Sequence, residues 1–145
     1  LQKAAHSNID FSLVLDENVV FVQCDSRQIR QAVTNLIQNS IDSIETRTED
    51  LQSENGKIKI ALSVEDRFGN IIISDNGRGL PKEGRHRLIE PYVTTREKGT
   101  GLGLAIVAKI VEDHRGVFKI QDGSDLGVGA TAIMRIPKFI SLTAL

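Results

Sequence analysis

The stretch Asp75-Asn76-Gly77-Arg78-Gly79 constrains this chain more than any other part of its sequence. It follows the apolar run Ile71-Ile72-Ile73, with Ser74 between them, and ends at Leu80-Pro81. Such an apolar run is typical of a central strand that is covered on both faces. The strand would deliver one carboxylate, and then two glycines, to the end of a sheet. A lone acid after a strand is usually a turn residue, so a functional meaning requires phosphate and metal sites elsewhere in the chain.

Composition places the chain among ordinary globular domains. It has 145 residues, of which 40% are hydrophobic and 26% charged, and its net charge is −1. These values favour one domain with one core and argue against nucleic-acid binding and membrane spans. Cys24 is the single cysteine, which excludes an internal disulfide and a cysteine-based zinc site. The opening residues resemble a cut within a longer protein, so we expect an excised single domain over residues 1–145.

Hydrophobic periodicity predicts strands, two long helices and one long loop. Strands are expected at 9–15 and 19–23, paired as a hairpin with a half-buried face on the first, at 57–65 and 71–75 as a second hairpin, and at 117–121 and 130–136. One helix runs from an N-cap at Asp25-Ser26 to about Arg47, and another from Leu102 to a C-cap at Gly116. Residues 84–90 could form a third, short helix within a mobile loop, and the tail 138–145 has no clear pattern.

The first long helix carries an unusual polar face. Asn35, Asn39, Asp42 and Thr46 follow one another at helical spacing, opposite the apolar stripe. A solvated surface explains most such faces. However, exposed helix faces usually carry Lys and Glu, whereas asparagine is a poor helix former. Two amides on one stripe therefore indicate a role for their oxygens, which are hard ligands suited to Mg²⁺.

Three alternating glycines, Gly99, Gly101 and Gly103, open the second long helix. Free N–H groups at a helix start, with no side chains in the way, form an anion site. A flexible hinge explains a single glycine, but three in alternation favour phosphate. The segment is neither a P-loop nor a dinucleotide fingerprint, since it lacks the Gly-Lys-Ser/Thr sequence and the third glycine at the required spacing.

A phosphate site, a carboxylate at a strand end and an amide-bearing helix together suit a nucleotide with Mg²⁺. A carboxylate accepts a hydrogen bond from an exocyclic amine such as that of adenine.

These segments, in this order, resemble the catalytic and ATP-binding domain of sensor histidine kinases, within the group that includes DNA gyrase B, Hsp90 and MutL. Residues 35–42 (NLIQNSID) look like the N box, 75–79 (DNGRG) like the G1 box, 90–96 (EPYVTTR) like the F box with Tyr92 in place of Phe, 99–104 (GTGLGL) like the G2 box, and 127–131 (GVGAT) like the late Gly-Thr element. The likeness extends from about Ile9 to Pro137. Residues 88–107 are most similar to nitrogen-regulation sensors of the NtrB/NtrY type.

The resemblance implies a fold. It is an α/β (α+β) two-layer sandwich of the Bergerat type, with a mixed, largely antiparallel sheet of about five strands and about three helices on one face. Residues 80–98 would form a mobile ATP lid.

The resemblance also implies roles for individual residues. Asn39 would be the Mg²⁺ ligand and, with Arg96, a catalytic residue. Asp75 would accept from the adenine amine, and Gly77 and Gly79 would let the backbone approach the base. The remaining nucleotide-binding residues would be Asn35, Tyr92, Thr94, Thr95, Lys98, Gly99, Thr100, Gly101, Leu102, Gly103, Leu104 and Thr131, the last joining the adenine site through water.

The implied function is that of an ATP-dependent protein-histidine kinase in a two-component system. The acceptor would lie on a separate helical dimerisation domain, since none of His6, His86 and His114 stands in an acceptor motif. Implied partners are that domain, within a homodimeric kinase, and a cognate response regulator. The domain would be cytoplasmic, without membrane contact of its own, in a parent protein that can be anchored in the inner membrane.

Two departures from the family pattern bear on the alternatives. Asn35 stands where ATP-hydrolysing relatives carry a general-base glutamate, and a neutral amide cannot take that proton, so an ATPase clamp is disfavoured. Asp42 replaces a basic residue of many kinases, which leaves Arg96, Lys98 and Arg47 as candidate phosphate-binding cations. An anti-sigma-type serine kinase and a non-catalytic nucleotide-binding module remain alternatives.

Overall fold

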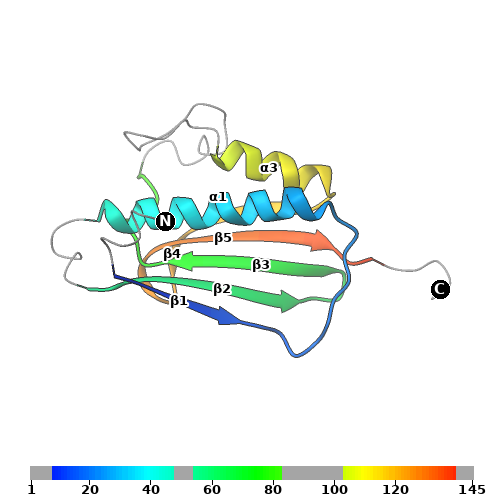
Figure 1. Ribbon diagram of the computed structural model, residues 1–145, viewed down its shortest axis with the longest axis horizontal. Helices are drawn as coiled ribbons and strands as arrows, with labels where there is room; N and C mark the ends of the chain where they lie inside the picture. Colours follow the sequence, from blue (N-terminus) through cyan, green and yellow to red (C-terminus); the bar gives the residue numbers. More distant parts are fainter. Residues whose placement is uncertain (1–7, 48–53, 83–102, 140–145) are drawn as a thin grey trace.

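The computed structural model describes residues 8–47, 54–82 and 103–139. In this part of the chain, two helices lie on one face of a five-stranded sheet (Figure 1). The elements are β1 (Ile9–Val14), α1 (Ser26–Glu45), β2 (Gly56–Val64), β3 (Phe68–Asp75), α3 (Gly103–Asp113), β4 (Val117–Ser124) and β5 (Gly127–Pro137). The predicted two-layer α/β sandwich is confirmed. The third predicted helix, at 84–90, and most of the predicted lid fall outside the described residues.

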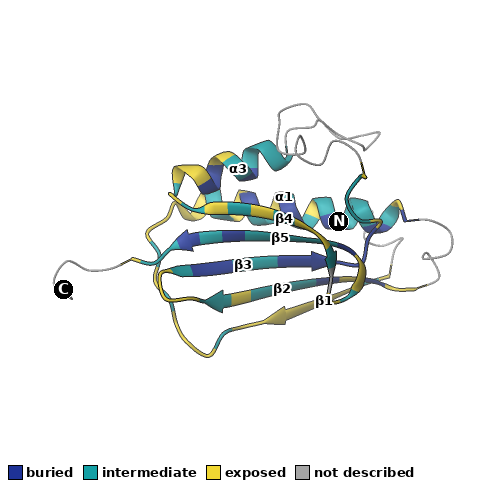
Figure 2. Ribbon diagram, turned by 180° about the vertical axis from the view of Figure 1, so that it is seen from behind, coloured by how far each residue is buried: buried dark blue, intermediate teal, exposed yellow. Residues whose placement is uncertain are grey.

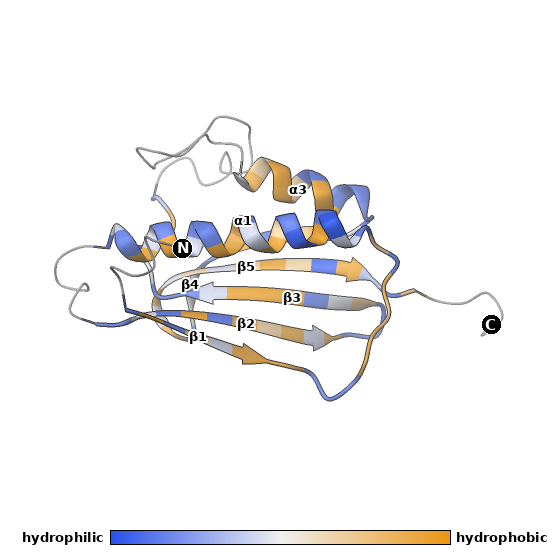
Figure 3. Ribbon diagram, in the orientation of Figure 1, coloured by the Kyte–Doolittle hydropathy of each residue, from blue (hydrophilic) through white to orange (hydrophobic). Residues whose placement is uncertain are grey.

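The sheet has the strand order β1-β2-β3-β5-β4. β1 runs parallel to β2, and all other neighbours are antiparallel, so the sheet is mixed and largely antiparallel as expected. The predicted hairpin of β2 and β3 is confirmed, with Ile60 opposite Ile73. β3 lies between β2 and β5, which explains why its middle is almost entirely hydrophobic (Figure 3).

The first predicted hairpin is wrong. Residues 19–23 do not pair with β1, and Val22 makes only an isolated bridge to Lys138. This segment instead connects β1 to α1, and Val20 packs against Gly69, where an added Cβ would lie 3.1 Å from Val20 Cγ1. β1 pairs with β2, far along the chain, because a parallel partner requires a crossover connection, which α1 provides.

The predicted half-buried face of β1 is also wrong. Phe11, Leu13 and Leu15 are 53%, 63% and 60% exposed. β1 is an edge strand, and Figure 2 shows it exposed along its length. Alternation of apolar residues therefore identified the strand, but its position at the edge of the sheet determined its burial.

The core lies between the helices and the three middle strands. α1 contributes a buried stripe with a four-residue repeat, and α3 contributes an aliphatic face. The buried residues are Ala32, Leu36, Ile44, Ile58, Ile73, Val107, Ile110, Val111, Met134 and Ile136. None of the described helices is long and apolar enough to cross a membrane.

The ends of both helices follow from local chemistry. The Asp25 side chain accepts from the N–H groups of Arg27 and Gln28, so the predicted N-cap is confirmed. At the end of α3 the left-handed residue is Arg115, with φ 59°, rather than the predicted Gly116. Gly116 is needed for a different reason, since a Cβ there would overlap the carbonyl oxygen of Arg135 on β5.

His114 connects the C-terminal end of α3 to the N-terminal end of α1. Its Nε2 accepts from the backbone N–H of Asp25 at 3.0 Å. Its Nδ1 lies 2.7 Å from the carbonyl oxygen of Ile110. The neutral tautomer that carries its proton on Nδ1 satisfies both contacts at once.

Replacement of His114 by alanine therefore removes two hydrogen bonds, one to the N–H of Asp25 before α1 and one to the carbonyl of Ile110 in α3. We expect His114→Ala to lower the free energy of unfolding by about 1–3 kcal/mol, as measured by urea denaturation. Glu112→Ala, an exposed change two residues away, is the control and should alter stability by less than about 0.5 kcal/mol. Equal stability of the two variants would contradict a linking role for His114.

Candidate functional site

The last residue of β3, Asp75, is a buried carboxylate rather than a turn acid. Its side chain is only 5% exposed. Oδ1 accepts from the N–H of Gly77 at 2.9 Å, and Oδ2 accepts from the hydroxyl of Ser40 at 3.0 Å. The N–H of Ala130 provides a further hydrogen bond. Burial raises the pKa of Asp75, and the three hydrogen bonds oppose that rise because each favours the charged form.

The residues that follow Asp75 are in close contact with α1. A Cβ at Gly77 would overlap the hydroxyl oxygen of Ser43. The N–H of Arg78 donates to that same oxygen at 3.1 Å. Gly79 then adopts φ +84°, which a glycine tolerates and other residues rarely adopt. Both glycines of the stretch thus have a structural reason, since Gly77 permits the close contact with Ser43 and Gly79 adopts a left-handed backbone.

Asn76 fixes the same turn to the neighbouring strand. It is 6% exposed. Its Oδ1 accepts from the N–H of Lys57 at 2.6 Å, and its Nδ2 donates to the carbonyl of Asn55 at 3.0 Å. Sequence reasoning assigned no role to this residue, although an asparagine directly after a buried strand is well suited to bind backbone groups.

β5 closes the other side of Asp75. A Cβ at Gly129 would overlap the carbonyl oxygen of Asp75, so only glycine permits this close approach. Thr131, in contrast, pairs with Ser74, and side chains of successive strand residues point to opposite faces. Its hydroxyl donates to the carbonyl of Gly123 at 3.0 Å. The structure therefore does not bring the Thr131 hydroxyl to Asp75, and the contact from this element is the N–H of Ala130.

The two asparagines of α1 face the start of α3. Asn35 Nδ2 lies 3.5 Å from the carbonyl oxygen of Gly103. A Cβ at Gly103 would lie 3.6 Å from Oδ1 of Asn39. The two helices run side by side in Figures 1 and 2. The amide stripe predicted from the sequence is thus half-buried against the N-terminal end of α3, where free N–H groups attract anions.

A buried carboxylate and an amide pair beside a helix start are therefore held on one end of the molecule. A family model described as histidine kinase-, DNA gyrase B-, and HSP90-like ATPase matches residues 24–140. The chain belongs to this family.

Individual relatives narrow the likeness to sensor histidine kinases. The nitrogen regulation protein NtrY of Azorhizobium caulinodans is 48% identical over 106 residues, which are 73% of this chain and 14% of that protein. The catalytic domain of histidine kinase ThkA superposes with a TM-score of 0.74 at 35% identity, covering 94% of this chain and 85% of that one. Histidine kinase ThkA in complex with the response regulator protein TrrA gives a TM-score of 0.73 at 31% identity, over 95% of this chain and 36% of that one.

These matches confirm the predicted resemblance, including its nitrogen-regulation branch. The chain is a catalytic, ATP-binding domain of the sensor histidine kinase type. It spans 14% of the length of the NtrY relative, so the activity and the partners of the whole protein are treated below as proposals.

Several predicted site residues of this kinase domain lie outside the described part of the chain. They are Tyr92, Thr94, Thr95, Arg96, Lys98, Gly99, Thr100, Gly101 and Leu102. Leu104 is described, and it packs against the core cluster from the first turn of α3.

Arg47, a predicted phosphate-binding cation, and Asp42, which replaces a basic residue of many kinases, are both described by the structure. Arg47 is 7% exposed, and its guanidinium donates to the carbonyls of Ile44 and Glu54. These contacts give it a structural role at the end of α1 and do not support the predicted role as a phosphate-binding cation. Asp42 accepts from Nε2 of Gln38 at 3.0 Å along the helix surface.

The donor set of the described residues suits a phosphate-bound metal rather than a metal held by protein alone. Among residues 8–47, 54–82 and 103–139, no group of three His, Cys, Asp or Glu side chains could hold a metal ion. An amide oxygen such as that of Asn39 fits Mg²⁺, which usually keeps several waters and takes phosphate oxygens as ligands.

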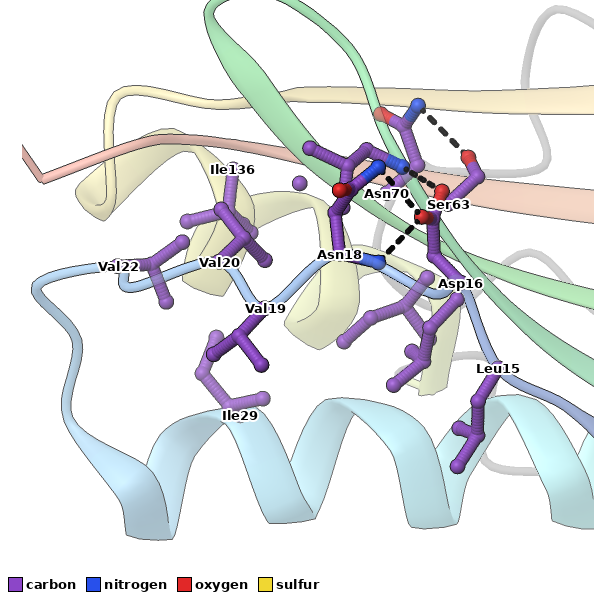
Figure 4. Close-up of a pocket in the computed structure, with 14 residues that line it drawn as sticks. Leu15, Asp16, Asn18, Val19, Val20, Val22, Ile29, Ser63, Asn70 and Ile136 are labelled. Atoms are coloured by element: carbon purple, nitrogen blue, oxygen red, sulfur yellow. Dashed lines mark hydrogen bonds between the residues drawn. The ribbon is translucent and has the colours of Figure 1, made fainter.

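An apolar pocket of about 350 Å³ lies at the opposite end of β3 from Asp75 (Figure 4). Its lining is mainly aliphatic and comprises Leu15, Asp16, Asn18, Val19, Val20, Val22, Ile29, Leu62, Ser63, Val64, Gly69, Asn70, Ile71 and Ile136. The carboxylate of Asp16, one of the lining residues, accepts hydrogen bonds from the N–H groups of Asn18 and Val64, and these bonds lower the pKa of Asp16. None of the described residues that line the pocket is positively charged and its lining is mainly aliphatic, so it does not suit a phosphate.

The close approach of Gly129 to Asp75 generates a prediction. Gly129→Ala should force β5 away from Asp75, lowering the free energy of unfolding by about 1–3 kcal/mol and weakening ATP binding. Gly127→Ala is the control, because its φ of +122° makes alanine unfavourable while no atom lies within 4 Å. It should lose stability but retain ATP affinity, as measured by thermal unfolding and calorimetry. Unchanged affinity in Gly129→Ala would show that β5 does not shape the site.

Proposed function

We propose that this domain binds Mg-ATP and transfers the γ-phosphoryl group to a histidine on a separate helical dimerisation domain. The observation that carries the proposal is the buried Asp75 carboxylate, held at the end of β3 on the same end of the molecule as Asn39 and the start of α3. The family match supports ATP as the nucleotide.

Asp75 is the reader of the base. A carboxylate accepts a hydrogen bond from the exocyclic amine of adenine. Guanine presents a carbonyl oxygen at the equivalent position, so two acceptors would face each other. Because the site is buried, leaving the carboxylate without its donor is costly, and that cost discriminates between the two bases.

Asn39 is the metal ligand, and the N-terminal end of α3 binds the phosphates. The Asn39 amide oxygen would contribute one ligand to Mg²⁺, with phosphate and water as the others. When bound, the ion neutralises charge that develops on the transferred group. Gly103 keeps the space in front of Asn39 open, since its missing Cβ would stand 3.6 Å from Oδ1.

Asn35 favours transfer to an acceptor over hydrolysis. Its amide lies against the start of α3, 3.5 Å from the Gly103 carbonyl. An amide is not basic at neutral pH and cannot activate water. The phosphoryl group therefore goes to a nucleophile that another domain supplies.

We propose that the domain is one part, residues 1–145, of a longer homodimeric kinase, with residues 80–98 as its ATP lid. Its partners would be the kinase's own dimerisation domain and a response regulator, as in the complex of ThkA with TrrA. We further propose that the domain works on the cytoplasmic side of a membrane-anchored parent, in nitrogen regulation as in NtrY.

Base reading by Asp75 is tested with Asp75→Asn. The amide loses the charge and turns a donor toward the adenine amine, so ATP affinity should fall about 10- to 100-fold. The unfolding temperature of the free domain should be unchanged or higher, because a buried charge has been removed. Calorimetry and thermal unfolding measure the two effects. Asp10→Asn, an exposed change on β1, is the control, and an unaltered affinity in Asp75→Asn would refute the role of the carboxylate.

Metal-dependent transfer is tested with Asn39→Ala. The dimerisation domain of the parent kinase is supplied in trans with labelled ATP and Mg²⁺. Loss of the ligand should reduce labelling of the histidine at least 100-fold, whereas Gln38→Ala, on the exposed side of the same turn, should label normally. The acid stability of the label identifies the acceptor, since phosphohistidine is acid-labile and phosphoserine is not. Acid-stable label would indicate a serine kinase, and full labelling by Asn39→Ala would exclude the metal role.

A further inference from the structure

We propose that Ser40 is a positioning residue for base recognition. Its hydroxyl orients the Asp75 carboxylate so that the carboxylate accepts a hydrogen bond from the adenine amine, which increases the affinity for ATP. This inference rests on the proposed reading of adenine by Asp75. It goes further because it assigns base discrimination to a residue of α1 that does not face the phosphates.

Ser40 occupies a core position without being apolar. It belongs to the buried stripe of α1, where its neighbours one turn away are Leu36 and Ile44. It is 5% exposed. A buried hydroxyl costs stability unless it is hydrogen-bonded, so a serine at this position requires a partner. The partner is Oδ2 of Asp75 at 3.0 Å.

The direction of this hydrogen bond is fixed by chemistry. An ionised carboxylate can only accept, so the Ser40 hydroxyl donates. Such a bond to a charged acceptor is stronger than one between neutral groups. It favours the charged form of Asp75 against the desolvation that burial imposes.

The two carboxylate oxygens of Asp75 accept hydrogen bonds from different elements of the fold. Oδ1 accepts from Gly77, in the turn after β3, and Oδ2 accepts from Ser40, on α1. Donors on both oxygens, together with the N–H of Ala130, fix the plane of the carboxylate about its terminal bond. A carboxylate offers about four acceptor positions, and their directions are fixed once the plane of the group is fixed.

Ser40 is adjacent to Asn39 in sequence, yet the two side chains serve different parts of the site. Successive residues of an α-helix point about 100° apart. Asn39 faces Gly103 on α3, whereas Ser40 faces Asp75 on β3. Loss of the Ser40 hydroxyl should therefore affect the base end of the site and leave the phosphate end unchanged.

A pair of nucleotides isolates this effect. ATP carries the exocyclic amine, and purine riboside triphosphate is the same molecule without it. We expect Ser40→Ala to bind ATP about 10-fold more weakly than the wild type and purine riboside triphosphate within about twofold of it. Binding is measured by calorimetry on the chain at neutral pH with Mg²⁺. A serine with a merely structural role would change both affinities by the same factor, and that result would overturn the inference.

The wild type separates failure of this inference from failure of the proposed function. If wild-type protein binds the two nucleotides equally, the reading of the amine by Asp75 is itself wrong. If the wild type prefers ATP and Ser40→Ala prefers it to the same extent, only the role of Ser40 is refuted. Ser63→Ala is the matched control, because it removes a hydroxyl that binds the Asn70 amide at 3.2 Å and lies near the other end of β3.

The pH dependence of ATP affinity gives a second readout. Burial raises the pKa of Asp75, and the amine contact is fully present above that pKa and lost as pH falls through it. Without the Ser40 donor the pKa should rise further, so the loss of ATP affinity should begin at a higher pH in Ser40→Ala. An unshifted profile would contradict the inference. If Ser40→Ala does not fold, Ser40→Cys, which keeps the shape with a weaker donor, should show the same two changes at smaller size, and their absence would refute the role.

Discussion

The burial of one carboxylate, that of Asp75, is the constraint on which the site depends. A charged group with 5% exposure is stable only if hydrogen bonds replace the water it has lost. The donors come from three separate elements: Ser40 on α1, Gly77 in the turn after β3, and Ala130 on β5. Helix, turn and strand must therefore meet at one point, and that point is the end of the central strand.

Two glycines make this meeting possible. The turn residue Gly77 touches Ser43 of α1 so closely that a Cβ would overlap its hydroxyl, and Gly129 approaches the Asp75 carbonyl in the same way. Their common property is the missing side chain, which lets two backbones approach the same carboxylate. α1 then extends the arrangement, because its buried stripe carries Ser40 to Asp75 while its amide stripe meets the start of α3. One helix thereby connects the Asp75 carboxylate with the start of α3, the proposed base and phosphate ends of the site.

Local patterns in the sequence were sufficient for α1, for the hairpin of β2 and β3, and for the importance of the 75–79 stretch. They failed where a contact spans a long stretch of chain. The pairing of β1 with β2 joins Ile9 to Gly56 across the whole of α1, and no local signal opposes a hairpin with residues 19–23. For Thr131 the structure gives only its register opposite Ser74, since a shift of one residue along β5 moves a side chain to the other face of the sheet, and its role in the adenine site stays a prediction.

Ser40 illustrates a different gap between sequence and site. Ser40 is a small residue within an apolar helical stripe, and sequence analysis interprets such a residue only as part of the packed core. The overlooked signal was the hydroxyl, because a donor in the core implies an acceptor that is also buried. Asp75 is such an acceptor, at the end of a strand that contains Ile71-Ile72-Ile73, so the pair could have been inferred from two segments considered together.

The buried charge also relates stability to function. Since burial raises the pKa of Asp75, the folded domain without nucleotide bears part of the cost of an under-solvated carboxylate. With only this group considered, stability is greatest below the pKa of an unfolded aspartate and decreases as pH rises through the higher folded value. In the proposed complex the adenine amine would offset that cost by donating to the same carboxylate, so binding energy would be concentrated at the position that distinguishes adenine from guanine. A neutral residue at position 75 would avoid this cost, so a buried carboxylate there supports the proposed donor from outside the chain.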